Sequence, residues 1–355
     1  MLSLLSFRDT TVTEGLRSIV SLWIDIFLPY YVASRSIRNM EGLRHALTGF
    51  VMAAMVLAPI AVFEAVRGWR LYPATMDILG LPMNVFGSYL IRSGFLRPTG
   101  TVMNSIVLGY VMVVALGFFV YLKGNLGRPM HRWLGLTVLS GGILASLSRG
   151  PWVGAAFLVI VFILLGPRPV GRLVKSGLLG SAALLVLAQL PHGQLFIDMM
   201  PGFGTVEQGN VEYRADLLTN ALPVIERHLL FGSTDFLYAP ELQVMMQGEG
   251  IIDIVNSYVG VALNFGVVGL VFFAGAFATA FLQLRRGMRL ARQINPDDVV
   301  MGRALWATLA AIMLIIYTVS SISIVPTVYW PVIGLCVAYA KAMKDASENL
   351  KEARR

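Results

Sequence analysis

Long apolar blocks recur along the whole chain and are separated by short polar or basic gaps. A helix needs about 20 mostly apolar residues to cross the hydrocarbon core of a bilayer. By that measure nine blocks are predicted membrane spans: about 19–34, 46–66, 101–122, 134–147, 151–166, 176–190, 258–284, 304–322 and 325–342. The pattern predicts an all-α polytopic membrane protein, a helical bundle of about nine spans with one large external loop.

The segment 134–165 is predicted to form two short spans joined by a turn. Basic gaps flank it on both sides, and Ser148-Arg149-Gly150-Pro151 stands at its centre. As one helix it would be about 48 Å long, well beyond a hydrocarbon core of about 30 Å. A helix tolerates proline in its first turn, where no amide hydrogen is needed. We therefore expect a hairpin with Arg149 at its outer tip.

Lysine and arginine gather in the gaps, and 19 of the 28 lie in five segments: 35–45, 123–133, 167–175, 285–303 and the tail from 341. If the spans alternate in direction, all five segments lie on one side of the membrane. The positive-inside rule identifies that side as the cytoplasm. The same alternation puts residues 1–18 outside. Either further spans precede them, or the first block, with Asp25 and Pro29, lies in the membrane interface.

The longest stretch without a predicted span is 191–257, with nine acidic residues, two arginines and a net charge of −7. Alternation puts it outside, and loops of this length are usually functional or disordered. Apolar residues recur in it near the helical period: Leu217, Leu218, Ala221, Val224, Ile225 and Leu229. The predicted division is an N-terminal membrane bundle (1–190), a loop with a helical segment (191–257), and C-terminal spans with a basic cytoplasmic tail (258–355).

The composition agrees with a membrane protein, because 56% of the residues are hydrophobic and only 14% are charged. A soluble domain has about a quarter charged residues, so soluble enzymes, nucleic-acid-binding proteins and secreted disulfide scaffolds are excluded. The net charge of +8 lies in the gaps and reports topology, not a nucleic-acid partner. Cys336 stands alone and the four histidines fit no zinc spacing, so neither a metal site nor a cofactor is predicted.

Two arginines are the main candidates for chemistry. Arg149 is expected at the hairpin tip and Arg214 in the external loop, on the same side of the membrane. Two guanidinium groups can hold a diphosphate through bidentate, charge-assisted hydrogen bonds. The acidic run GEGIIDIVNSY, which ends at Tyr258 just before the next span, is the third candidate.

Each candidate also has a plainer interpretation. Arg149 can extend to lipid headgroups, as long cationic side chains do at membrane interfaces. Arg214 can pair with Glu212 or Asp216, and such exposed pairs contribute little to stability. Glu249 and Asp253 can be solvated loop acids, and His192 and His228 can be structural or interfacial groups. Residue spacing alone leaves these alternatives open.

Four stretches carry a resemblance to the O-antigen ligase and O-antigen polymerase superfamily of bacterial inner-membrane proteins. They are LRPTGTVMNSIVLGYVMVVAL, SLSRGPWVGAAF, YRADLLTNALPVIERHLLFG and VNSYVGVALNFGVVGLVFF. The second is similar to the family's Ser-Arg-Gly at the outer start of a helix. The third is similar to the family's loop arginine followed by a helix and a Pro-Leu-Phe-Gly type of ending. The fourth resembles the family's His-Asn-Ser-Tyr before a glycine-rich span.

The resemblance implies a GT-C-type glycosyltransferase that acts on the periplasmic face without a metal or cofactor. Such proteins move a glycan, with inversion, from undecaprenyl diphosphate to an acceptor hydroxyl on a glycan or lipid-linked sugar. Arg149 and Arg214 match the family's functional arginines, which implies diphosphate recognition. The other residues assigned to substrate binding through the matching motifs are Arg97, Asn256, Tyr258 and Glu249.

One position departs from the family pattern. Where ligases of the family commonly have His before Asn-Ser-Tyr, this chain has Val255, which cannot accept a proton. Asp253 would share a face with Val255 in extended backbone and is the first substitute base, with Glu249 second. The run QGEGIIDIVNSYV resembles a variant of exopolysaccharide polymerases, so a polymerase is preferred over a ligase.

Two other classes of function remain open. A transporter or flippase would keep acids or broken helices at the membrane midplane, whereas the predicted spans have almost no charge, with Asp25 and Glu64 near ends or in the uncertain first block. A non-catalytic relative that assembles with polysaccharide export proteins is suggested by Val255.

Overall fold

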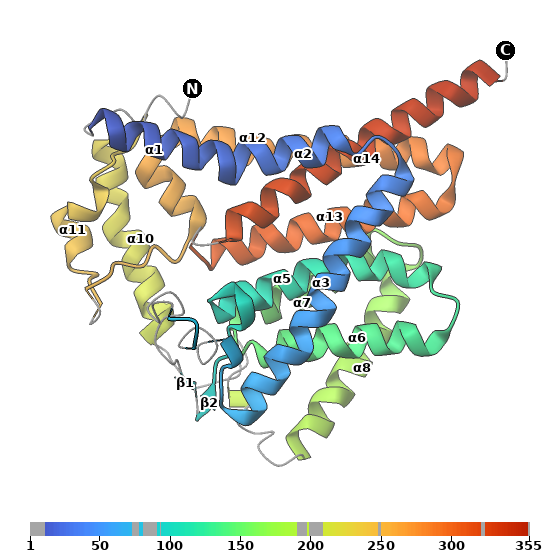
Figure 1. Ribbon diagram of the computed structural model, residues 1–355, viewed down its shortest axis with the longest axis horizontal. Helices are drawn as coiled ribbons and strands as arrows, with labels where there is room; N and C mark the ends of the chain where they lie inside the picture. The colour runs from blue at the N-terminus through green and yellow to red at the C-terminus, as the bar shows by residue number, and fades with distance from the viewer. Residues whose placement is uncertain are drawn as a thin grey trace. The chain divides into compact units, whose positions relative to one another are not determined.

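The computed structural model describes residues 11–72, 78–80, 91–92, 94–189, 197–198, 209–247, 250–320 and 324–353. Helices form most of this part of the chain (Figure 1). Glu249 and His192 lie outside the described residues.

The N-terminal half of the chain contributes eight labelled elements. They are α1 (Val12–Leu22), α2 (Leu28–Ser36), α3 (Met40–Arg67), β1 (Ile91–Arg92), β2 (Phe95–Leu96), α5 (Ser105–Leu122), α6 (Pro129–Ala145) and α7 (Arg149–Leu164). A π-helical turn, Trp23–Phe27, joins α1 to α2 without a break. Pro29 accounts for this turn, because a proline cannot donate to the carbonyl four residues before it and its ring crowds that carbonyl.

The C-terminal half contributes six further helices. They are α8 (Pro169–Gln189), α10 (Gly209–Arg227), α11 (Pro240–Gln243), α12 (Ser257–Ile294), α13 (Pro296–Tyr317) and α14 (Val325–Ala353). The helix predicted within the segment 191–257 is confirmed as α10. It buries Leu217, Ala221 and Val224, whereas Leu218 and Leu229 are exposed.

Six helical segments of the described chain are long and apolar enough to cross a membrane. They are Val12–Ser36, Met40–Arg67, Ser105–Asn125, Pro169–Val186, Ser257–Ile294 and Pro296–Tyr317. An all-α polytopic membrane protein is thereby confirmed. The blocks predicted at 134–147, 151–166 and 325–342 correspond to α6, α7 and α14, which are not among the six. The total of nine spans stays a prediction.

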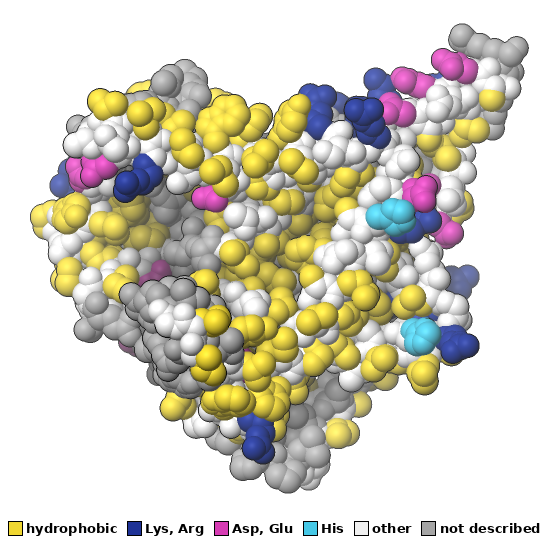
Figure 2. All heavy atoms as spheres, viewed as in Figure 1, with side chains coloured by type: hydrophobic (Ala, Val, Ile, Leu, Met, Phe, Trp, Pro, Cys, Tyr) yellow, Lys and Arg dark blue, Asp and Glu magenta, His cyan; other side chains and the backbone are white. Residues whose placement is uncertain are grey.

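Exposed apolar side chains are a second mark of a membrane protein. Large hydrophobic side chains are exposed along α1, α3 and α8, and hydrophobic atoms cover much of the visible face in Figure 2. Contiguous apolar surface of this kind is rare on soluble monomers and typical of contact with lipid.

Two compact units make up the chain, each from segments far apart in sequence. Unit 1 consists of Met1–Ile37, Glu207–Arg285 and Ile316–Ala338, and unit 2 of Arg38–Val206, Arg286–Ile315 and Tyr339–Arg355. The predicted division into 1–190, 191–257 and 258–355 follows the order of the chain, not its packing into units, and it stays a prediction.

Helix α5 is the centre of unit 2, since nearly all of its side chains are buried. Small residues let its neighbours approach closely. A Cβ added at Gly109 would lie 2.7 Å from Ser146 Oγ and 2.8 Å from Pro151 Cβ. A Cβ added at Gly142 would lie 2.8 Å from the Cβ of Ala58. Small side chains at such crossings are how helices pack in membranes, where no hydrophobic effect pushes them together.

Polar contacts define the two ends of this helix group in unit 2. Arg44, at the start of α3, donates from Nε to the hydroxyl of Tyr121 near the end of α5 (3.1 Å). Glu64, near the other end of α3, bonds to Thr99 and Gly100, just before α5. Helices α3 and α5 are therefore antiparallel. This agrees with the predicted alternation of spans, while the membrane side of each end stays a prediction.

Candidate functional site

The turn between α6 and α7 carries the first predicted arginine. Helix α6 ends at Ala145 and α7 begins at Arg149, which confirms the predicted division at Ser-Arg-Gly-Pro. Leu147 reverses the chain with φ +48°, an uncommon left-handed backbone conformation for a leucine. Trp152 Nε1 donates to the carbonyl of Ile143 (2.8 Å), so an α7 side chain binds the last turn of α6. Pro151 stands in the first turn of α7, as predicted.

Arg97 meets this turn from a distant part of the sequence. Its Nη2 donates to Ser148 Oγ (3.1 Å), and Ser148 Oγ donates to the carbonyl of Ser146 (2.9 Å). Ser148 is fully buried, whereas Arg97 and Arg149 are each half-buried. The fold thus places Arg97 against the residue directly before Arg149. We call Arg97, Ser148 and Arg149 the arginine corner.

The second predicted arginine lies in unit 1. Arg214 is exposed on the second turn of α10, and its Nη2 donates to the carbonyl of Thr318 (3.4 Å). Ser257, the first residue of α12, donates from Oγ to the carbonyl of Val319 (2.7 Å). The short segment after α13 therefore brings Arg214 and the start of α12 to one place. No pattern in the sequence marked Thr318 and Val319 for this role.

Asp253 is held in the loop before α12. The hydroxyl of Tyr213 donates to the backbone carbonyl of Asp253 (3.1 Å), and the Asp253 side chain is half-buried. The expected extended backbone at this point is wrong, because Val255 N–H donates to the carbonyl of Asp253 (3.0 Å). Such a bond between residues two apart marks a tight γ-turn. The turn satisfies backbone groups where the chain bends into α12, and the role of Asp253 as substitute base stays a prediction.

Val255 has a packing role at the position where the family commonly has His. It packs with Tyr213 and other partly buried residues against a core cluster of unit 1. The buried members of that cluster are Leu217, Ala221, Val224, Leu242, Met245, Val259 and Leu263. An apolar side chain suits these surroundings, where an unpaired polar group would cost free energy.

Asn256 and Tyr258 begin the next helix. Asn256 Oδ1 accepts from the N–H groups of Tyr258 (3.0 Å) and Val259 (3.3 Å), so this residue caps α12. The Tyr258 ring packs edge-on against Phe273, with centroids 5.7 Å apart, and lies 6.5 Å from the ring of Tyr317. Both residues are half-buried and remain accessible in part.

A break in α12 joins the third and fourth motifs. Helical backbone angles are lost at Gly266, and the chain leaving α10 occupies the gap. Val267 N–H donates to the carbonyl of Leu229 (2.8 Å), and Ser233 N–H donates to the carbonyl of Leu263 (2.8 Å). In an unbroken helix the N–H of Val267 would donate to the carbonyl of Leu263. Here both groups are bonded to the segment after α10 instead. This arrangement ties α10, which carries Arg214, to α12.

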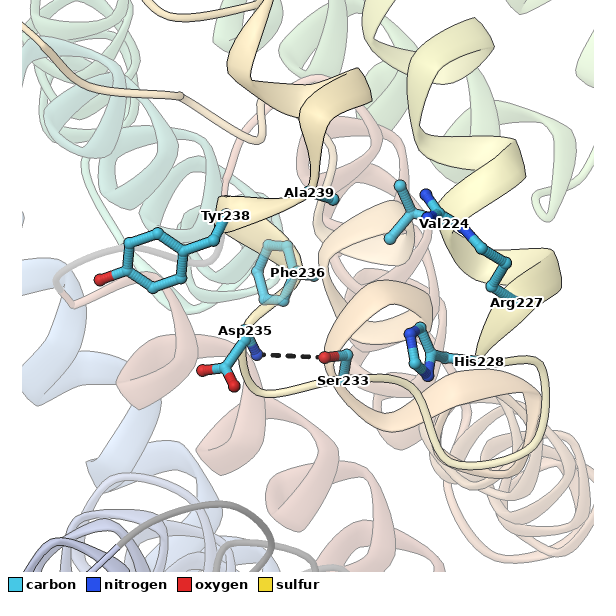
Figure 3. Close-up of a pocket in the computed structure, with 8 residues that line it drawn as sticks. All are labelled: Val224, Arg227, His228, Ser233, Asp235, Phe236, Tyr238 and Ala239. Atoms are coloured by element: carbon cyan, nitrogen blue, oxygen red, sulfur yellow. Dashed lines mark hydrogen bonds between the residues drawn. The ribbon is translucent and has the colours of Figure 1, made fainter.

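An open pocket of about 250 Å³ lies beside this crossing in unit 1 (Figure 3). Its lining mixes apolar, aromatic and polar side chains: Val224, Arg227, His228, Ser233, Asp235, Phe236, Tyr238 and Ala239. In Figure 3 the backbone N–H of Asp235 donates to Ser233 Oγ (3.1 Å), which closes the loop below the pocket. The interpretation of His228 from the sequence was a structural or interfacial group, not a member of a pocket.

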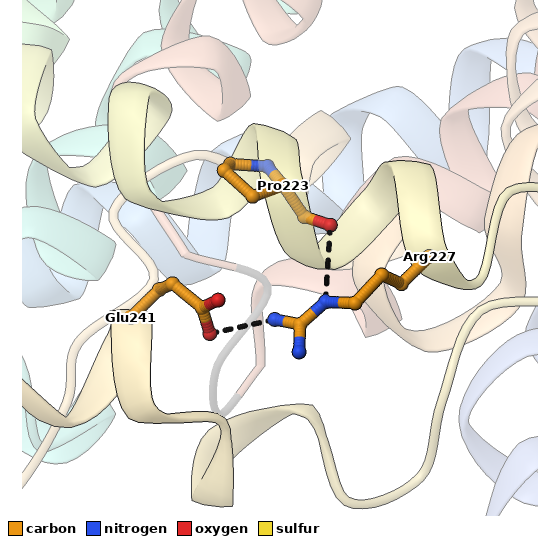
Figure 4. A network of polar contacts seen from close by, with 3 residues as sticks. All are labelled: Pro223, Arg227 and Glu241. Carbon is orange, nitrogen blue, oxygen red and sulfur yellow. Dashed lines mark hydrogen bonds and ion pairs between the residues drawn. The ribbon is translucent and has the colours of Figure 1, made fainter.

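Arg227 at this pocket belongs to a small polar network (Figure 4). Its Nη2 forms an ion pair with Glu241 Oε2 (2.6 Å), and its Nε donates to the carbonyl of Pro223 (3.3 Å). A hydrogen bond from its own backbone N–H lowers the pKa of Glu241, and the Arg227 guanidinium lowers it further. The pair links the end of α10 to α11.

Arg149 lies in unit 2 and Arg214 lies in unit 1. Unit 2 brings Arg97 to the turn that carries Arg149, and unit 1 brings Arg214 and Ser257, the first residue of α12, to the segment after α13. That the two groups of residues act together stays a prediction.

Residues 134–274 match a family model described as O-Antigen ligase. The matched range begins in α6, ends within α12 and contains the second, third and fourth motifs with Arg149, Arg214 and Asp253. A search among curated proteins finds no match to the chain. The family match confirms the resemblance to the O-antigen ligase and polymerase superfamily that the motifs indicated.

Proposed function

We propose that this chain, whose residues 134–274 carry the O-antigen ligase match, is a GT-C-type glycosyltransferase of the bacterial inner membrane. It transfers a glycan from undecaprenyl diphosphate to an acceptor hydroxyl on the periplasmic face, with inversion and without a metal. The acceptor is a glycan or a lipid-linked sugar, and polymer extension is preferred over ligation. The main support for the proposal is the family match, which includes both Arg149 and Arg214.

The proposed step forms one bond and breaks one. The acceptor oxygen attacks the anomeric carbon, and the bond from that carbon to the diphosphate oxygen breaks as the diphosphate takes the electron pair. Arg149 and Arg214 stabilise the negative charge that develops on the leaving group, usually the largest electrostatic contribution to such catalysis. A carboxylate takes the hydroxyl proton, which typically contributes about 10² to 10⁴ in rate.

Asp253 is the carboxylate we assign as the base. It lies in the turn that leads into α12, held by Tyr213, and its side chain is partly accessible. Val255 packs against the apolar cluster and has no group that accepts a proton. Glu249 is the second choice for the same role.

The remaining residues of the proposed site bind substrate. Arg97 adds a second guanidinium to the arginine corner, where it supports recognition of a phosphate. Asn256 uses Oδ1 as a helix cap, which leaves its amide NH₂ as the group to donate to a sugar or phosphate oxygen. Tyr258 offers a phenol beside it.

Transport is the second candidate function, because the interruption of α12 at Gly266 is a feature of transporter binding sites. In transporters the freed backbone groups face substrate or ions. Here the N–H of Val267 and the carbonyl of Leu263 are bonded to the segment after α10. The break therefore has a structural partner, which favours transfer over transport.

Reconstitution of the full chain in proteoliposomes tests the proposal. The substrate is an undecaprenyl-diphosphate-linked repeat unit from the producing strain, and gel electrophoresis of the product distinguishes a polymer ladder from a single addition. We expect Arg149→Ala and Arg214→Ala each to reduce transfer at least about 100-fold, the scale of losing one preorganised donor. Arg227→Ala, on the same helix as Arg214 and paired with Glu241, is the matched control.

Undiminished polymer in either arginine variant contradicts the assignment. Energy-coupled movement of the lipid-linked glycan that is insensitive to both substitutions favours the transporter. If Asp253→Asn causes no loss and Val255→His no gain, the non-catalytic alternative is supported.

A further inference from the structure

Glu64 is a buried carboxylate that no motif identified. It lies one turn before the end of α3, and its side chain is 0% exposed. Its Oε2 accepts from the N–H groups of Thr99 (3.0 Å) and Gly100 (3.0 Å), and its Oε1 accepts from the N–H of Leu71 (3.1 Å). Burying a carboxylate is costly unless its oxygens are filled, and three charge-assisted bonds fill them.

The segment that Glu64 holds is the one that presents Arg97. Thr99 and Gly100 follow Arg97 by two and three residues. The residue between Arg97 and Thr99 is Pro98, which is buried. Proline fixes one of its two backbone torsions, so Pro98 reduces the freedom of the chain between Thr99 and Arg97. Arg97 in turn donates to Ser148 Oγ at the start of α7. An unbroken series of contacts within unit 2 therefore runs from α3 to the residue before Arg149.

We infer that Glu64 is a positioning residue for the anion-binding arginine corner. Its carboxylate holds the 97–100 segment so that Arg97 stays on Ser148, and Arg97 and Arg149 then bind the donor diphosphate together. Glu64 itself touches no substrate, since it is fully buried. The inference rests on the proposed function in one respect, the identity of the anion as a lipid diphosphate.

The test is a double-mutant cycle on the full chain in detergent, with undecaprenyl diphosphate without a glycan as the probe. Glu64→Gln keeps the shape of the side chain, but its NH₂ group is a donor that faces a backbone N–H donor, so at least one hydrogen bond is lost. We expect it to weaken binding about 10-fold, the scale of losing one charge-assisted bond. In an Arg97→Ala background the same change should weaken binding less than about 2-fold further, because its effect passes through Arg97.

A purely structural role predicts a different outcome. The two losses would then multiply, and the inference would be overturned. Leu47→Ala is the matched control, since Leu47 is also fully buried on α3 but makes none of these contacts. It should lower thermal stability while leaving the effect of Arg97→Ala unchanged.

Two further measurements keep the test decisive. If Glu64→Gln does not fold, Glu64→Asp is used, which should weaken binding partly and again lose its effect in the Arg97→Ala background. Failure of the wild-type chain to bind undecaprenyl diphosphate overturns the inference. Normal binding without any glycan transfer contradicts the proposed function and leaves the positioning role intact, so the two failures are distinguishable.

Discussion

Gly232 and Gly266 meet where the chain leaving α10 crosses the break in α12. A Cβ added at Gly232 would lie 2.7 Å from the backbone N of Gly266, and one added at Gly266 would lie 2.5 Å from the backbone N of Phe231. Both glycines have left-handed backbone, with φ of +67° and +63°. Only glycine meets both conditions, close backbone approach and positive φ, without strain.

Gly266→Ala should therefore destabilise the folded chain. The left-handed backbone alone costs about 1–3 kcal/mol, and the contact with Phe231 adds to it. Thermal unfolding in detergent should show a lower Tm. Gly275→Ala is the control on the same helix, because a Cβ there meets nothing within 4 Å. An equal Tm for the two variants would show that the crossing contributes nothing.

Ser148→Ala should weaken the arginine corner without removing an arginine. The serine hydroxyl accepts from Arg97 and donates to Ser146, so its loss removes two hydrogen bonds. A hydrogen bond to a charged group contributes about 1.5–3 kcal/mol, so we expect KM for the lipid-linked donor to rise about 10-fold or more. Steady-state kinetics check this. Ser176→Ala, which loses only a local bond to Leu173, should leave KM unchanged.

Asp253→Asn should reduce kcat by about 10² to 10⁴ if this carboxylate is the base. Asp235→Asn changes an exposed carboxylate in the loop between α10 and α11 and serves as the control. Val255→His should give no gain, because position 255 packs against the apolar cluster of unit 1. Single-turnover transfer assays separate these outcomes. A faster Val255→His variant would mean that this position faces substrate.

The ion pair between Arg227 and Glu241 should make stability depend on acid pH (Figure 4). The pKa of Glu241 is lowered in the folded chain, first by the hydrogen bond from its own backbone N–H and then by Arg227. A lowered pKa stabilises the fold above the unfolded value of about 4.3 and loses that effect as pH falls through the folded value. The Tm difference between wild type and Glu241→Gln should therefore be present at pH 6 and be smaller at a pH below about 4.3. A difference that is the same at both pH values would contradict the ionic origin.

Local features of the fold were predictable from the sequence. The length of the apolar blocks identified α3 and α5, and apolar periodicity identified α10, because both are read directly from the order of side chains. The break between α6 and α7 followed from the length of the apolar block and from Pro151. The backbone near Asp253 was not predictable in the same way, because a γ-turn depends on how Tyr213 and α12 hold the loop.

Glu64 shows why the contacts between polar residues could not be predicted from the sequence. In the sequence it is one charge near the end of an apolar block, and its partners Thr99 and Gly100 are 35 and 36 residues away. Arg97 and Ser148 are 51 residues apart. No local spacing relates such residues, since helices of the same hydrophobic pattern can pack in many orders.

The order of residues alone indicated a membrane-embedded helical protein, the motifs similar to the O-antigen ligase family and the arginines in them, because each of these is a property of short segments. Packing decided which distant residues meet. Arg97 bonds to Ser148 and Arg214 bonds to Thr318, and Gly232 lies against Gly266. Helices in a bilayer are driven together by close fit and by hydrogen bonds between distant segments. Such pairings exist only once the helices are assembled.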